Sequence, residues 1–215
     1  MNTREKALRV NLTDQVYGSF AEIGAGQEVV RWFFQAGGAA GTVAQSISAY
    51  DMKVSDAIYG ECQRYVARER LVSMLEKEYW LNVERLAGER GADTAFFSFA
   101  DTVSARNFRG TNDCHAWMGI RFQAKPGDQH SQIVVHIRML DKSNALQADA
   151  IGMVGVNLVY GSAFLSDKPN ELLNSLMEGL DPGRVAAGLR CHRRGIQLRH
   201  GLHRVAHDGA AAGTY

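Results

Sequence analysis

The sequence predicts an α+β fold in which a mixed, largely antiparallel sheet is flanked by helices and followed by a disordered C-terminal tail. Three observations predict it. Residues 65–89 have the apolar periodicity of a long amphipathic helix, residues 94–140 contain three strand-like segments joined by short connections, and helical periodicity returns after residue 141. A three-layer α/β arrangement is the alternative, because helix blocks on either side of a strand block can cover one or both sheet faces.

Glycine clusters divide the first fifty residues. Residues 17–23 are typical of a short strand that ends at Gly24-Ala25-Gly26, and residues 27–35 are rich in helix formers and aromatic side chains. A second cluster at residues 37–41 ends that helix. Residues 42–50 fit a strand and a helix equally well.

The middle of the chain contains one long helix and three strands, at residues 65–89, 94–103, 115–123 and 132–140. A strong turn signal, Lys125-Pro126-Gly127-Asp128, joins the second and third strands. Consecutive strands with such short connections pair antiparallel, because a parallel pair needs a crossover of about a dozen or more residues. Two helices follow, at residues 144–160 and 168–180, and Pro169 suits an early position of the second.

Composition favours one domain over residues 1–183, because no linker, repeat or low-complexity segment divides this part of the chain. The 46% hydrophobic and 22% charged content is ordinary for a soluble protein. The charged N-terminus lacks the apolar region of a secretory signal, and no apolar run is long enough to span a membrane. We therefore expect a cytoplasmic protein. Three widely spaced cysteines argue against a disulfide framework and a structural zinc site.

The last 32 residues, 184–215, differ from the rest in composition. They hold six Arg and one Asp, so they carry a formal charge of about +5 and leave the rest of the chain near −4. A basic arm that binds nucleic acid is one interpretation. A shifted reading frame is the other, since codons for Gly195-Ile196-Gln197 exist that read Ala-Phe-Asn one base away. We favour the shifted frame and an unstructured segment, so the sequence argues against a nucleic-acid partner.

The first candidate binding site is the turn formed by Gly24, Gly26, Gln27 and Glu28. Backbone N–H groups at a helix N-terminus bind anions, and glycines let a phosphate approach closely. The dinucleotide fingerprint is incomplete, because Val29 occupies the position of its third glycine. Carboxylates beside the turn repel phosphate unless a metal intervenes. A plain tight turn is the competing interpretation.

The second candidate site comes from strand alternation. One face of two neighbouring strands is apolar, with Met118, Ile120, Phe122, Val135, Ile137 and Met139. The opposite face carries Trp117, Arg121, His136 and Arg138, which could grip a carboxylate or phosphate. A solvated sheet face with arginine stems covering apolar surface is the alternative.

Carboxylates at strand and helix ends form a third group. Asp101 and Asp141 lie near the ends of two predicted strands, where both catalytic carboxylates and turn caps occur. Asp51 and Asp56 could cap the next helix or join Glu22 around a hard cation. Structural capping is the better interpretation of Asp51 and Asp56, and we assign no metal site.

Several sequence strings resemble one family of longer bacterial proteins, namely FAEIGAGQEV at residues 20–29, SAYDM at 48–52, SDAIYG at 55–60, FADTV at 99–103 and WMGIRF at 117–122. The resemblance covers residues 1 to about 184 and implies that the chain is the N-terminal part of such a protein with a frame-shifted end. Members carry inconsistent names, nicotinate-nucleotide adenylyltransferase or TonB-dependent receptor.

Neither of these names fits the residues. An adenylyltransferase of that type needs an HxGH motif, and the nearest string, His200-Gly201-Leu202-His203, has a different order. A receptor barrel needs a signal peptide and many alternating strands. The resemblance therefore implies neither a catalytic residue nor a cofactor.

The sequence thus predicts a protein that binds a phosphorylated or nucleotide-like small molecule through the glycine turn, with Arg121, His136 and Arg138 as further candidate ligands. A non-catalytic scaffold or assembly module, including a homo-oligomer, is the alternative. Trp32, Phe33 and Phe34 motivate it, because three successive aromatic side chains cannot all face one core from a single helix. Nucleic-acid binding by the basic tail is the third hypothesis.

Overall fold

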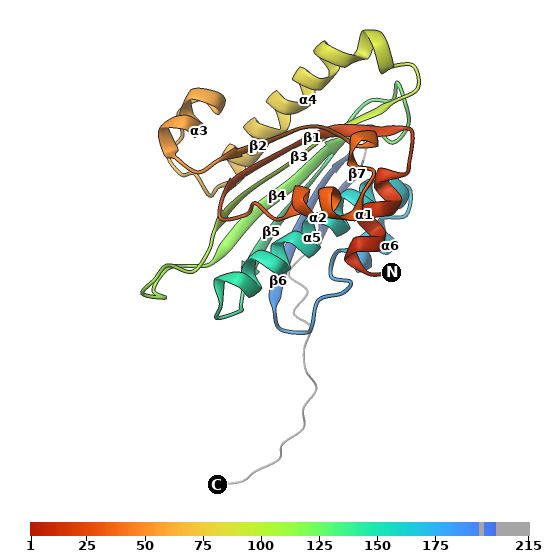
Figure 1. Ribbon diagram of the computed structural model, residues 1–215. Coiled ribbons are helices and arrows are strands. Elements are labelled where there is room, and N and C mark those ends of the chain that lie inside the picture. The colour runs from red at the N-terminus through yellow and green to blue at the C-terminus, as the bar shows by residue number, and fades with distance from the viewer. Residues whose placement is uncertain (194–195, 201–215) are drawn as a thin grey trace.

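A seven-stranded mixed sheet forms the centre of the computed structural model, which describes residues 1–193 and 196–200 (Figure 1). The strand order is β2-β1-β3-β4-β5-β6-β7. The strands are β1 (Val16–Gly24), β2 (Val43–Ala49), β3 (Ala95–Ser104), β4 (His115–Phe122), β5 (Ser131–Met139), β6 (Val185–Arg193) and β7 (Ile196–His200). β1 pairs in parallel with both β2 and β3, and the remaining neighbours pair antiparallel.

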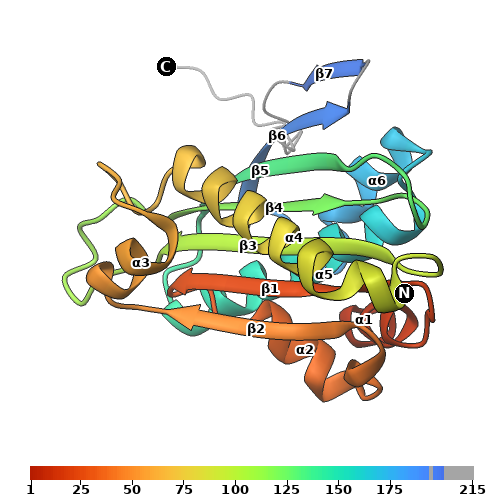
Figure 2. The same ribbon diagram turned by 90° about the horizontal axis from the view of Figure 1, so that it is seen from above.

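Helices cover both faces of this sheet, as Figure 2 shows from above. The helices are α1 (Thr3–Asn11), α2 (Val29–Ala36), α3 (Met52–Tyr59), α4 (Arg68–Arg90), α5 (Asn144–Phe164) and α6 (Pro169–Leu176), with a short 3-10 turn at Ala39–Gly41. The larger core lies between the sheet and α1, α2, α5 and α6. A smaller core lies under α3 and α4 on the other face. The predicted α+β class with a mixed, largely antiparallel sheet is confirmed, and the three layers also agree with the α/β alternative.

The alternation argument located the core face of the antiparallel strands correctly. Met118, Ile120 and Phe122 of β4 are buried, as are Val135, Ile137 and Met139 of β5, and all six belong to the larger core. Residues 42–50, which fit two structures, form the edge strand β2. Neighbouring strands along the chain pair antiparallel from β3 to β5, as their short connections predicted.

Helix α1 was absent from the sequence prediction, although a local signal for it exists. The Asn2 side chain accepts a hydrogen bond from the Glu5 backbone N–H, and the Glu5 side chain accepts one from the Asn2 backbone N–H. This reciprocal pair is a capping box, which satisfies two donors at the helix N-terminus. Ala7 and Val10 then bury the apolar side of α1 in the larger core.

The predicted start of the unstructured segment at residue 184 is wrong. Arg184 donates from Nε to Asp141 at 2.9 Å and from Nη1 to Asp149 at 3.1 Å, and Val185 is 8% exposed. β6 continues the sheet beside β5, and β7 continues it beside β6. Backbone pairing does not depend on side-chain composition, so an Arg-rich segment can extend a sheet. Residues 194–195 and 201–215 lie outside the described residues, and the single domain over residues 1–183 stays a prediction.

Across the part of the chain that the structure describes, none of the helices combines the length and the apolar character needed to cross a membrane.

Candidate functional site

The carboxyl ends of β1 and β3 form the topological switch point of the sheet. The connection after β1 runs through α2 on one face and places β2 on one side of β1. The connection after β2 runs through α3 and α4 on the opposite face and places β3 on the other side (Figure 2). Ligand sites in open sheets of this kind occur where two such connections diverge, at the carboxyl ends of the strands. The glycine turn predicted as a binding site lies there.

The turn after β1 packs directly against β3. Gly24 has a φ of +77°, and a Cβ atom there would lie 2.6 Å from the Val103 carbonyl oxygen. A Cβ atom on Gly26 would lie 2.6 Å from Oδ1 of Asp101. Within the described residues, the backbone N–H groups of Gly26 and Gln27 donate to no acceptor. The turn therefore combines close backbone packing with two free donors, which is the arrangement that suits an anion.

The N-terminus of α2 is not the free anion site that the sequence predicted. Glu22 accepts hydrogen bonds from the Val29 N–H at 2.8 Å and the Val30 N–H at 3.2 Å. Its side chain thereby fills the position that an external anion would take at a helix N-terminus. Glu28, the N-cap residue, makes no capping bond itself. Only the turn ahead of the helix is left for a ligand.

Asp101 lies beside Glu22, because the two residues are register partners on β3 and β1. Asp101 is 0% exposed, and neither of its carboxyl oxygens accepts a hydrogen bond from the described residues. Burial, followed by the charge of Glu22, raises the pKa of Asp101 well above its ordinary 3.8. Burial also raises the pKa of Glu22, from 4.5 to about 7. Two buried acids in contact cannot both ionise easily, so the pair holds at least one proton near neutral pH.

A hollow of about 280 Å³ opens next to the turn, between α2 and α5. This volume is close to the lower end of small-molecule pockets. It is lined by Glu28, Arg31, Trp32 and Gln35 on the α2 side and by Ala145, Ala148 and Asp149 on the α5 side. One aromatic side chain among several polar ones suits a small molecule with a planar part and a polar part.

Basic side chains lie at the same end of the sheet. Arg106 and Arg109 belong to the loop between β3 and β4, and Lys53 belongs to α3; Figure 2 shows this loop and α3 at one end of the sheet. None of these three residues forms a salt bridge within the described part of the chain. The Arg106 N–H donates to Oε1 of Gln147 at 2.9 Å, which ties the loop to α5 beside the hollow. The sequence analysis did not select Arg106 and Arg109. A signal for them existed, because two arginines occur in the loop that follows the strand containing Asp101.

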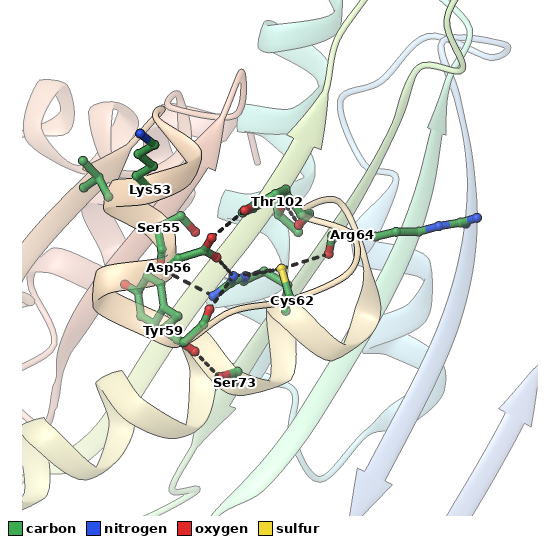
Figure 3. A network of polar contacts seen from close by, with 12 residues as sticks. Lys53, Ser55, Asp56, Tyr59, Cys62, Arg64, Ser73 and Thr102 are labelled. Carbon is green, nitrogen blue, oxygen red and sulfur yellow. Dashed lines mark hydrogen bonds and ion pairs between the residues drawn. The ribbon is translucent and has the colours of Figure 1, made fainter.

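On the other face of the sheet, the loop between α3 and α4 is built around a buried guanidinium (Figure 3). Arg70 of α4 is 2% exposed and donates to Oδ1 of Asp56 and to the Gly60 carbonyl oxygen, both at 2.7 Å, and to Sγ of Cys62 at 2.8 Å. The Tyr65 hydroxyl donates to the other Asp56 oxygen at 2.6 Å. This network fixes the loop between α3 and α4 against β3.

The structure separates the acids that could have shared a hard cation. Asp51 caps α3 by accepting from the Lys53 and Val54 N–H groups, and Asp56 pairs with Arg70, while Glu22 caps α2. Among residues 1–193 and 196–200 no three His, Cys, Asp or Glu side chains are placed to hold one metal ion. Structural capping is thus the role of Asp51, and Asp141 pairs with Arg184.

The second candidate site is divided by α4. Trp117 and His136 are register partners with ring centroids 4.5 Å apart, so the predicted shared face exists. Arg121, however, lies under α4, where it donates to Oε1 of Gln132 at 2.9 Å and faces Glu76 at 3.8 Å. Arg138 is exposed and pairs with Asp113 at 3.4 Å. Arg121 therefore does not join His136 and Arg138 in one site, because a helix covers only its end of the face.

This strand order, with a parallel unit of three strands continued by antiparallel strands and helices on both faces, defines a mixed α and β domain with a topological switch point. No protein-family model matches the chain, and no curated protein is found as a relative. Among solved structures, the chain is similar to the competence/damage-inducible protein CihA from Agrobacterium tumefaciens, with a TM-score of 0.52, 12% identity, and 74% of this chain and 94% of that chain covered.

A protein of the competence-damaged protein (CinA) superfamily from Klebsiella pneumoniae 700603 is similar to the same extent. Its TM-score is 0.52 at 14% identity, and the match covers 75% of this chain and 98% of that chain. At such identities the two likenesses establish a shared fold. They say nothing about which side chains bind or react, so the function rests on the site described above.

Proposed function

We propose that the protein binds a phosphorylated or nucleotide-like small molecule at the carboxyl ends of β1 and β3. The observation that carries this proposal is the glycine turn at the switch point. There the N–H groups of Gly26 and Gln27 donate to no acceptor among the described residues, and the next residue, Glu28, lines a hollow of about 280 Å³. The turn receives the phosphate, and the hollow receives the planar part beside Trp32. Arg106 and Arg109 supply positive charge from the neighbouring loop.

The acids below the turn do not prevent this binding. Two ionised carboxylates would repel a phosphate, but burial raises the pKa of Glu22 to about 7 and that of Asp101 well above its ordinary value. The pair therefore carries less than two negative charges at neutral pH. Deprotonation above pH 7 adds charge beneath the turn, so anion affinity is expected to fall as the pH rises.

The first experiment measures binding of AMP, ADP, ribose 5-phosphate and adenosine, with and without Mg²⁺, by isothermal titration calorimetry and thermal shift. We expect the phosphorylated compounds to bind and adenosine to bind at least tenfold more weakly. Gly24→Ala should weaken binding at least tenfold, because its new Cβ would lie 2.6 Å from the Val103 oxygen. Gly127→Ala is the matched control, since Gly127 has the same φ of +77° and open space around it. Absence of binding by every compound would remove the proposal.

The second experiment follows sulfate binding between pH 6 and pH 8, because the charge of sulfate is constant over this range. Affinity should fall several-fold as the pair loses its proton. Glu22→Gln should abolish this pH dependence, since the glutamine oxygen can still accept from the Val29 N–H, the shorter of the two bonds, without titrating. Unchanged pH dependence in this variant would exclude Glu22 as the titrating group.

Assembly is the second candidate function, favoured by exposed apolar surface. Of the three successive aromatic residues, Phe33 is buried in the larger core, Trp32 lines the hollow, and Phe34 is 54% exposed. Strand β2 ends the sheet on one side and contains no charged residue or proline, the usual devices that prevent edge pairing. Size-exclusion chromatography with light scattering tests this candidate. A monomer at all concentrations up to about 100 μM, a range in which weak pairs associate, would argue against it.

A further inference from the structure

The outer face of β4 and β5 carries two histidines in contact, on the side of the sheet opposite to Asp101. Nε2 of His136 lies 3.3 Å from Nδ1 of His115. The two side chains come from neighbouring antiparallel strands, whose register pairs His136 with Trp117 and His115 with Arg138. Both imidazoles are partly buried and supported by the sheet, so their separation is set by backbone pairing.

We propose that His115 and His136 bind a divalent transition metal ion of the zinc class. Zinc binds imidazole nitrogen at about 2.0–2.1 Å with tetrahedral angles, which separates two ligand nitrogens by roughly 3.3 Å. The observed separation of 3.3 Å matches this value. Without a metal ion the two nitrogens are within hydrogen-bond range, with donor and acceptor roles that depend on the tautomer.

The surroundings orient the two rings and leave room for the ion. The indole of Trp117 packs on the His136 ring with centroids 4.5 Å apart and planes tilted by 31°, which holds the ring in place. Gly188 of β6 is the register partner of His136, and a Cβ atom on Gly188 would meet nothing within 4 Å. Water can therefore complete the coordination shell on this side, as in zinc sites with open positions.

The charges near the pair permit binding of a cation. Arg138 is a positive group near the pair, and its guanidinium pairs with Asp113 at 3.4 Å, which offsets its charge. Burial, followed by the neighbouring His115 and Arg138, lowers the pKa of His136, whereas Asp113 raises it. The lowered pKa keeps this imidazole neutral near pH 7, and the neutral form is the one that ligates metal.

The ligand set is two nitrogens with water, since the described residues offer no third His, Cys, Asp or Glu within reach. Such a site binds more weakly than a structural zinc site with four protein ligands. It also leaves positions free for a second ligand. The sequence assigned no metal, because His115 and His136 lie far apart in the chain and follow no ligand spacing.

The test titrates the full chain with Zn²⁺ and Co²⁺ at pH 7.5, using calorimetry and the visible absorption of tetrahedral Co²⁺. His115→Ala and His136→Ala should each remove one equivalent of bound metal or weaken it at least tenfold. His130→Ala is the matched control, because His130 is an exposed histidine on the connection before β5. The histidines after residue 190 stay unchanged in all variants, so any metal they bind is the same throughout.

Equal affinity and stoichiometry in wild type, His115→Ala and His130→Ala would overturn the proposal. If His136→Ala fails to fold, His115→Ala decides, since its side chain is not part of either core. Loss of the Co²⁺ absorption band in His115→Ala is by itself sufficient to support the metal site. Two rings joined only by a hydrogen bond would give no such band in the wild-type protein.

Discussion

Two adjacent residues of β3 show two treatments of buried polar groups. Thr102 faces α4, and its hydroxyl donates to the Tyr65 carbonyl oxygen at 2.7 Å, which joins it to the satisfied network around Arg70 (Figure 3). Asp101 points to the opposite face, where its oxygens accept no hydrogen bond and its nearest charged neighbour is another acid, Glu22. On one face a buried charge is paired with an opposite charge, and on the other a buried carboxyl has no hydrogen-bond partner.

This difference distinguishes buried polar groups that stabilise the fold from buried polar groups that serve a function. A buried ion pair with all its donors used, such as Arg70 with Asp56, holds two segments together. A buried carboxyl without partners costs free energy and persists in native proteins where a function requires it. The contrast is why we place the ligand above Asp101 and Glu22 and assign the Arg70 network to scaffolding.

The largest expected effect is on the structural side of the comparison. Arg70→Ala leaves Asp56 and the Gly60 carbonyl oxygen without their donor. Removal of one partner from a buried pair destabilises a protein by about 3–5 kcal/mol. Urea denaturation should show a loss of this size, while Arg68→Ala, an exposed arginine on the same helix, should change the free energy of unfolding by less than about 0.5 kcal/mol. A small effect of Arg70→Ala would show that the network is not structural.

The next effect concerns the acid pair and pH. The folded-state pKa of Glu22 is about 7 against 4.5 for the free group, so its stability contribution is complete below pH 4.5 and is lost as the pH rises through 7. The shift corresponds to roughly 3 kcal/mol, lost between about pH 4.5 and 7. The raised pKa of Asp101 has the same sign.

Asp101→Asn should therefore be more stable than wild type at pH 8 and close to it at pH 5. Denaturation curves at the two pH values measure the difference. Glu84→Gln, at an exposed position of α4, is the control and should leave the pH dependence unchanged. A wild-type protein that gains stability from pH 5 to pH 8 would contradict the assignment of a shared proton.

The smallest expected change in stability concerns a buried hydroxyl that has no hydrogen-bond partner. The Ser55 hydroxyl is buried near the Arg70 network but has no hydrogen-bond partner. Ser55→Ala removes the unsatisfied group, so we expect a change between zero and about 1 kcal/mol of stabilisation. Thr102→Val, which removes a satisfied hydroxyl, should instead destabilise by about 1 kcal/mol. Thermal denaturation of the two variants side by side compares a partnered hydroxyl with an unpartnered one.

Much of the fold could be predicted from local patterns. The alternation of apolar residues located β3, β4 and β5 to within one or two residues, and the periodicity of residues 65–89 located α4. Asp101 was singled out because it stands near the end of a strand. The role of Glu22 was not predicted, because nothing local shows that its carboxylate reaches forward to the N-terminus of α2.

In the tail, the sequence analysis failed to predict structure that is present. Residues 185–193 do alternate, with apolar side chains at Val185, Ala187, Leu189 and Cys191. The basic composition was given more weight than this alternation, yet their backbone pairs with β5. Arg184 was grouped with the basic tail, although its guanidinium bonds to Asp141 and Asp149. Net charge cannot reveal such pairing, because the partners lie elsewhere in the chain.

The sequence by itself determined the long helix α4 and the strands β3, β4 and β5, together with the apolar face of β4 and β5, because these properties depend on neighbours two to four residues away. The tertiary structure alone decided that β1 lies between β2 and β3. That choice places Glu22 beside Asp101 and the glycine turn above them. Hydrogen bonds between parallel strands join backbone groups whatever the side chains are, so the contact that raises both pKa values exists only once the sheet has formed.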